Sequence, residues 1–112
     1  MSYKEINLRA LTPESAVTEI MYEIAACRAD NIDLIRINIL ENAEGYSDFK
    51  KIISSLIKLF KKMKQKGSIQ LFATAESFNK STTEAVYLQN KYPQLLSSPT
   101  QPQTGAYIYI KI

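Results

Sequence analysis

Five lysines share one face of a segment whose residue pattern predicts a helix. The helix is expected from Phe49 to about Lys66, because apolar residues recur there every three or four positions. Its opposite side carries Lys50, Lys51, Lys58, Lys61 and Lys62. A row of ammonium groups can neutralise the phosphates of a nucleic acid, and each contact adds salt-dependent affinity. The alternative is a solvated helix face, which is how most runs of charge are used.

The net charge of the chain points to the same segment. The total of +3 is divided into −2 over residues 1–40, +4 over residues 41–80 and +1 over residues 81–112. Most of the excess therefore lies on the lysine-bearing helix. No arginine joins these lysines, which weakens the case for specific recognition of one nucleic-acid sequence.

Carboxylates in the turn after the second predicted strand form another group with possible chemistry. Glu41, Glu44 and Asp48 follow a strand expected over Asp33–Leu40, at the end where α/β sheets place their ligands. With Glu14, these carboxylates could hold Mg²⁺ through oxygen ligands. The alternative is that Asp48 caps the next helix and the glutamates are solvated, and it is favoured because acidic residues are common in turns. No metal and no cofactor is therefore predicted.

The composition excludes several other kinds of site. The 112 residues include no histidine and one cysteine, Cys27. A Ser-His-Asp or Cys-His catalytic arrangement and a Cys/His zinc site within one chain are therefore excluded. An internal disulfide is also excluded, which fits a reducing compartment, and no apolar run approaches the ~20 residues of a membrane span. We expect a single domain over residues 1–112, a cytoplasmic location and no membrane partner.

A strand and a helix are predicted at the start of the chain. The strand is expected over Tyr3–Arg9, where apolar and polar residues alternate. Thr12 is a suitable N-cap and Pro13 a suitable first residue for a helix that should end near Asp30. The apolar stripe of this helix is predicted to consist of Val17, Ile20, Met21, Ile24 and Cys27.

The middle and end of the chain continue the alternation of helices and strands. Gly67 is a natural C-terminal cap for the lysine-bearing helix, and Ser68–Ala73 is predicted to form a third strand. Ser81 and Glu84 have the spacing of a capping box, which predicts a short helix ending at Pro93. The order of elements predicts an α/β fold: a two-layer βαβαβ(α)β sandwich with a small mixed, mostly parallel four-stranded sheet.

The final predicted strand, Gly105–Ile112, carries two aromatic residues on one face. Tyr107 and Tyr109 alternate with isoleucines and are followed by Lys111. Exposed tyrosines beside a cation can stack with single-stranded bases. Burial under a helix is the alternative, and we favour it because tyrosine side chains are often largely buried.

Three short segments resemble one known family. Residues 6–14 are INLRALTPE, residues 42–45 are NAEG and residues 105–110 are GAYIYI. They resemble the Leu-Asp-Leu-His-Gly-Leu-Thr opening, the His-Gly-x-Gly turn and the Gly-Ala-Thr-hydrophobic strand of the Smr (small MutS-related) domain. The resemblance implies nucleic-acid binding and, in some members, nuclease activity.

The polar residues of the Smr motif are replaced in this chain. Asn7 stands at the position of the aspartate, Arg9 at that of the histidine and Ala10 at that of the adjacent glycine. An amide cannot exchange a proton as a carboxylate does, and a guanidinium stays protonated, so neither side chain can serve as a general base. Arg9 can still contact a phosphate. We therefore expect no enzymatic activity.

Two main functions remain open, and an enzyme that uses the turn carboxylates with a metal is a minor third alternative. The first is a non-catalytic, Smr-like nucleic-acid-binding or regulatory domain that binds RNA or DNA through residues on its basic surfaces. The predicted contacts are Arg9, Arg36, Lys50, Lys51, Lys58, Lys61 and Lys62. The alternative is a protein-interaction or regulatory module, homodimeric or bound to another protein, which uses the tyrosine strand or the surface of the first helix and has no nucleic-acid role.

Overall fold

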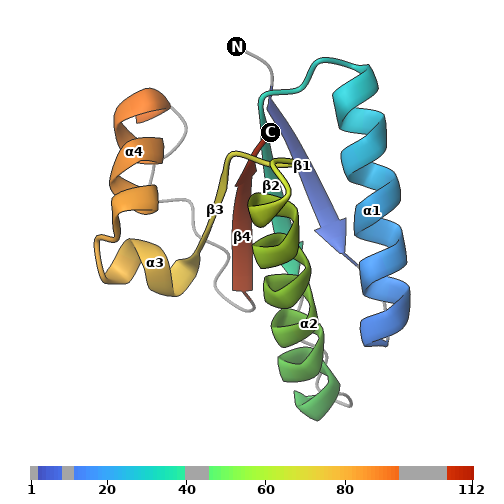
Figure 1. Ribbon diagram of the computed structural model, residues 1–112. Coiled ribbons are helices and arrows are strands. Elements are labelled where there is room, and N and C mark those ends of the chain that lie inside the picture. Colours follow the sequence, from blue (N-terminus) through green and yellow to red (C-terminus); the bar gives the residue numbers. More distant parts are fainter. Residues whose placement is uncertain (1–2, 9–11, 40–45, 94–105) are drawn as a thin grey trace.

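Strands and helices alternate along the chain, which confirms the predicted α/β class (Figure 1). The computed structural model describes residues 3–8, 12–39, 46–93 and 106–112. Its elements are β1 (Tyr3–Leu8), α1 (Pro13–Ala29), β2 (Leu34–Ile39), α2 (Tyr46–Gln65), β3 (Leu71–Thr74), α3 (Ala75–Asn79), α4 (Thr83–Lys91) and β4 (Ala106–Lys111). Among the helices described, none combines the length and apolar character needed to cross a membrane.

The four strands form one mixed sheet in the order β1-β2-β4-β3. β1 and β2 pair in parallel, with Ile6 opposite Ile37. β4 is antiparallel to both of its neighbours, with Ile110 opposite Ile35 in β2 and Phe72 in β3. The mixed sheet is therefore confirmed. β1, β2 and β3 all run in the same direction. Only β1 and β2 form a parallel pair, because β4 lies between β2 and β3 and runs the other way.

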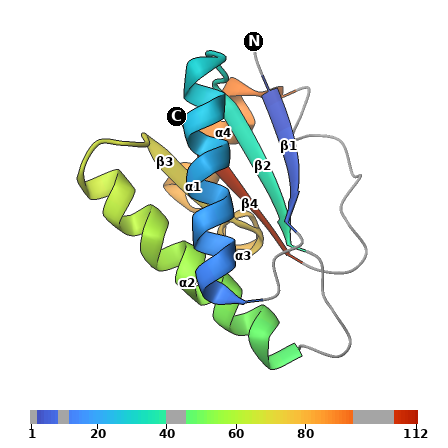
Figure 2. The same cartoon turned by 90° about the vertical axis from the view of Figure 1, so that its right-hand side faces the viewer.

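α1 and α2 cover one face of the sheet and enclose the larger core (Figure 2). Alternate residues of the strands point to this face, in agreement with their period-two pattern. The buried contributions from the two helices are Ala16, Ile20, Ile24, Cys27, Ile52, Leu56 and Phe60. Cys27 is a core thiol, and burial raises its pKa. The sequence correctly predicted Ile20, Ile24 and Cys27 of α1.

Met21 is the exception, because it does not belong to the buried stripe of α1. Its side chain is 53% exposed. The buried positions of the helix are spaced at 16, 20, 24 and 27, and Met21 lies about 100° around the helix axis from Ile20. The prediction that Met21 is part of the core is therefore wrong.

α3 and α4 pack on the other face of the sheet, over β3 and β4, and add a partial third layer (Figure 2). This face holds a smaller core that includes Leu34, Leu88 and Tyr92. The ring of Phe78 in α3 lies 5.5 Å from that of Tyr109 in an edge-to-face contact. Tyr107 and Tyr109 are only 7% and 3% exposed, so the preferred prediction that they are buried is confirmed.

Three helices end with the same turn, in which one residue has a positive φ angle. These residues are Asn31 (φ 57°), Gly67 (φ 76°) and Ser81 (φ 50°). In each turn, the next backbone N–H donates to the carbonyl oxygen five residues earlier, as Ser68 does to Met63 at 2.8 Å. Gly67 is therefore the C-terminal cap that the sequence predicts.

The capping box predicted at Ser81 is wrong. Ser81 belongs to the end of α3, a helix that the sequence analysis did not predict. Thr82 caps α4 instead, and its side-chain oxygen accepts from the backbone N–H of Ala85 at 3.3 Å. α3 has its own capping box between Thr74 and Ser77, in which serine takes the place of the usual glutamate.

Tyr92 and Tyr109, two of the three buried tyrosines of the smaller core, make a matched pair for mutagenesis. The hydroxyl of Tyr92 has no hydrogen-bond partner among the described residues, whereas that of Tyr109 accepts from Arg36 at 2.8 Å. We expect Tyr92→Phe to leave the free energy of unfolding unchanged or to raise it, and Tyr109→Phe to lower it by about 1 kcal/mol. Urea denaturation of both variants measures the difference. Equal destabilisation by the two substitutions would contradict the structure.

Candidate nucleic-acid interface

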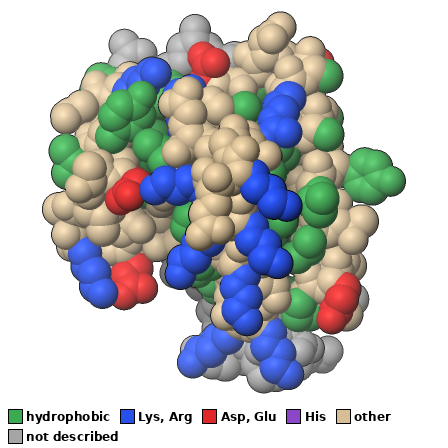
Figure 3. Space-filling model, in the orientation of Figure 1, with side chains coloured by type: hydrophobic (Ala, Val, Ile, Leu, Met, Phe, Trp, Pro, Cys, Tyr) green, Lys and Arg blue, Asp and Glu red, His purple; other side chains and the backbone are tan. Residues whose placement is uncertain are grey.

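α2 presents an almost purely basic surface (Figure 3). Seven lysines lie between residues 50 and 66, and no acidic residue follows Asp48 in this stretch. Ile52, Leu56 and Phe60 hold the opposite side of the helix against the sheet, so the lysines must point outward. The five predicted binding lysines are all exposed: Lys50, Lys51, Lys58, Lys61 and Lys62. The structure therefore brings these five side chains together on one helix.

Most of these ammonium groups are not neutralised within the part of the chain that the structure describes. No described acidic side chain forms an ion pair with Lys51, Lys58, Lys61 or Lys62. The lysines near the end of α2 also interact favourably with the partial negative charge of the helix C-terminus. The position of Lys62 thus helps the helix and leaves its charge available to an anion.

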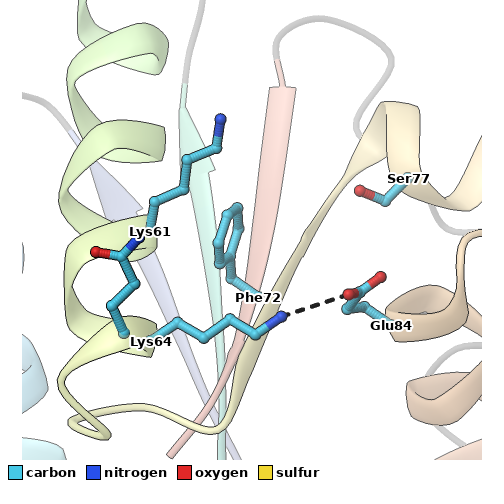
Figure 4. Close-up of a pocket in the computed structure, with 6 residues that line it drawn as sticks. Lys61, Lys64, Phe72, Ser77 and Glu84 are labelled. Carbon is cyan, nitrogen blue, oxygen red and sulfur yellow. Dashed lines mark hydrogen bonds and ion pairs between the residues drawn. The ribbon is translucent and has the colours of Figure 1, made fainter.

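A pocket of about 570 Å³ adjoins the lysine surface (Figure 4). It lies between the C-terminal half of α2 and the α3–α4 pair, with β3 between them. The residues that line it are Lys61, Lys64, Gln65, Phe72, Ser77 and Glu84. The ring of Phe72 packs 5.9 Å from that of Phe60, so the core holds it in place. The pocket therefore combines an anchored aromatic ring with hydrogen-bonding groups on both sides.

One ion pair crosses this pocket. Lys64 Nζ lies 3.4 Å from Glu84 Oε1, and it links α2 to α4 (Figure 4). A hydrogen bond from the backbone of Glu84 itself and the nearby Lys64 lower the pKa of the Glu84 carboxyl. Glu84 is therefore ionised near neutral pH. Because this carboxylate balances Lys64, Lys61 is the lysine of the pocket that is left to attract an anion.

Arg36 lies on the opposite face of the sheet from the lysines. Its Nε donates to Asn38 Oδ1 and its Nη1 to the hydroxyl of Tyr109, both at 2.8 Å. Its guanidinium carbon is 4.6 Å from the centre of the Tyr107 ring, a cation–π distance. The structure thus separates Arg36 from the lysine surface and engages it in local contacts. Arg9, the other predicted arginine, lies outside the described residues.

Asn7, in the segment that resembles the Smr opening, takes part in a hydrogen-bond network beside Arg36. The side-chain amide of Asn38, which is buried, donates to Glu5 Oε1 at 2.5 Å and to Asn7 Oδ1 at 3.0 Å. Both polar atoms of the Asn38 side chain therefore form hydrogen bonds, because its Oδ1 also accepts from Arg36. Nearby, burial raises the pKa of Tyr3 to about 12 and also raises that of Tyr109, although Arg36 opposes both shifts. The network is suited to holding neighbouring strands together.

The predicted carboxylate site is only partly within the described residues. Glu41 and Glu44 lie outside them, as does Gly45 of the Smr-like turn. α2 begins at Tyr46, so Asp48 lies inside its first turn, and the prediction that Asp48 caps the helix is wrong. Within the described part of the chain, no three His, Cys, Asp or Glu side chains are grouped so that they could hold a metal ion.

The pocket is the feature that sequence reasoning missed. Phe72 belongs to β3 and Glu84 to α4, and neither residue is part of a motif with the lysines. No signal in the sequence could have identified it, because it depends on where α3 and α4 pack against β3, beside the end of α2.

Comparisons with known proteins give no independent indication of function. No protein-family model, no curated protein and no solved structure matches the chain. The resemblance to the Smr domain stays a prediction made from the quoted segments.

Proposed function

We propose that this chain is a non-catalytic nucleic-acid-binding domain whose α2 lysines contact the phosphates of single-stranded RNA or DNA. The observation that carries the proposal is the row of exposed lysines on α2 directly beside a pocket with an aromatic wall. The lysines supply attraction that does not depend on base sequence. The pocket supplies a place for an unpaired base.

The phosphate contacts follow from the geometry of α2. A rise of about 1.5 Å per residue puts Lys58 and Lys62 roughly 6 Å apart along the helix axis. Neither is held in an ion pair with a described acidic residue, so no such pair has to be broken when a phosphate binds. Each neutralised phosphate releases counterions, which makes the affinity fall as salt rises.

The base contact follows from the pocket. A base entering it would meet the ring of Phe72, which is fixed by its contact with Phe60. The Glu84 carboxylate keeps acceptor capacity beyond its ion pair with Lys64, so it can accept from an exocyclic amino group of the base. Bases within a duplex are stacked on one another and cannot enter. Single strands should therefore bind more tightly than duplexes.

The absence of catalysis is part of the proposal. The chain has no histidine, and Asn7 replaces the acidic residue of the Smr motif. The Asn7 amide oxygen accepts a hydrogen bond from Asn38, a role that requires no ionisable group. Both observations support binding without cleavage.

A protein-interaction module is the second candidate function. It is favoured by the outer surface of α1, where Met21 and Tyr22 are 53% and 76% exposed. This surface is separate from the α2 lysines.

Charge removal on α2 tests the phosphate contacts. We expect the triple variant Lys58→Gln, Lys61→Gln, Lys62→Gln to reduce the slope of log affinity against log salt by about 2, because each phosphate contact of a single strand contributes ~0.7. Fluorescence anisotropy with a labelled single-stranded oligonucleotide measures the slope.

The matched control removes the same charge elsewhere. The triple variant Lys4→Gln, Lys80→Gln, Lys91→Gln has the same net charge but leaves α2 intact, and we expect it to keep the slope of the unchanged protein. The proposal fails if the unchanged protein does not bind at low salt. It also fails if the two triple variants lose affinity equally.

Removal of one aromatic ring tests the base contact. We expect Phe72→Leu to weaken single-strand binding by about fivefold or more and to leave duplex binding unchanged, because stacking contributes ~1–3 kcal/mol per base. Phe78→Leu is the control, since Phe78 packs on the other face of the sheet against Tyr107 and Tyr109. Thermal unfolding checks that both variants fold. Equal effects of the two substitutions would exclude the pocket as a base site.

A further inference from the structure

α1 is apolar on two sides, whereas a surface helix normally has one apolar side and one charged side. Its inner side packs against the sheet. On its outer side, Thr18, Met21, Tyr22 and Ala25 line a shallow depression of about 340 Å³. Met21 and Tyr22 are the two most exposed large hydrophobic residues among those described. Such a surface is typical of a contact with another protein.

Charges are absent from the middle of this outer side and present at its two ends. Glu14 is exposed in the first turn of α1 and Arg28 in the last. Every exposed residue between them is uncharged: Ser15, Thr18, Met21, Tyr22, Ala25 and Ala26. The remaining acidic residues, Glu19 and Glu23, lie to one side, and Glu23 pairs with Lys4 of β1 at 3.6 Å.

We propose that two copies of this chain associate through the outer sides of their α1 helices, packed antiparallel about a two-fold axis near Met21. The position of the end charges selects this arrangement. Glu14 and Arg28 are each seven residues from Met21, and positions seven apart lie on the same side of a helix. The two-fold axis therefore places Glu14 of one copy beside Arg28 of the other, twice in the dimer.

A parallel arrangement is disfavoured by the same charges. It would place the two Glu14 side chains together and the two Arg28 side chains together, and like charges repel. The antiparallel arrangement also aligns the two helix dipoles in opposite directions. The contact is isologous, so it closes with two copies and covers the same surface of α1 on both.

Both charged residues are available for the contact. Glu14 forms no ion pair with any described residue. Arg28 donates through Nη2 to the backbone carbonyl of Ser68, which positions its side chain at the end of α1. A guanidinium has five N–H donors, so Arg28 keeps others for a carboxylate.

The size of the surface determines how strong the dimer is. α1 has 17 residues, which corresponds to a length of about 25 Å. One pair of such helices buries less than the ~800 Å² per partner of a standard stable interface. A weak dimer is therefore expected, with a population that depends on protein concentration. This association does not depend on nucleic-acid binding, so the two proposals fail independently.

Charge reversal in two separate variants tests the dimer. Glu14→Arg and Arg28→Glu should each weaken self-association by roughly five- to tenfold, because each turns both end contacts into repulsions. An equimolar mixture of the two variants should associate as well as the unchanged protein, since every reversed charge then meets its opposite. Sedimentation equilibrium over about a hundredfold range of concentration measures all three samples.

Two further variants make the result independent of effects on folding. Met21→Glu changes an exposed residue on the proposed axis and should abolish the dimer while the thermal unfolding temperature stays the same. Glu19→Arg makes the same charge change as Glu14→Arg on another side of α1 and should leave the dimer intact. The proposal is overturned if the unchanged protein is monomeric throughout, if the mixture does not recover association, or if Glu19→Arg acts like Glu14→Arg.

Discussion

The pairing of β4 with both β2 and β3 is the constraint on which the other features depend. Because β4 lies inside the sheet, its alternating residues must enter two different cores. Ile108 and Ile110 join the core under α1 and α2, and Tyr107 and Tyr109 join the one under α3 and α4. The same strand brings the Tyr109 hydroxyl to Arg36, and this contact holds the guanidinium on the face away from the lysines.

The two proposed surfaces are consequences of this layered arrangement. α1 and α2 lie side by side on one face of the sheet, yet they present different outward surfaces (Figure 2). α2 exposes a basic surface that continues into the pocket formed with β3 and α4. α1 exposes an apolar surface with one charge of each sign at its ends. The two proposed contacts, one with a polyanion and one with a second copy of the chain, therefore use different residues.

Local features of the fold could be predicted from the sequence because they depend on neighbouring residues. The cap at Thr12, the turn at Gly67 and the lysine surface of α2 all follow from short-range spacing. The position of β4 could not be predicted, because its partners are distant along the chain. The pocket could not be predicted either, since the contact of Lys64 with Glu84 depends on the same long-range packing. Met21 was misplaced because an apolar side chain was assumed to be buried.

The most direct test of the account is a map of backbone amide chemical shifts during titration with a single-stranded oligonucleotide. If the strand binds along α2 and enters the pocket, the perturbed amides cluster around Lys58–Lys62, Phe72 and Glu84, three segments that meet only in the folded protein. The amides of Arg36 and Asn38, on the other face of the sheet, should not change. Perturbation centred on Arg36 and Asn38, or no perturbation at low salt, would contradict the account.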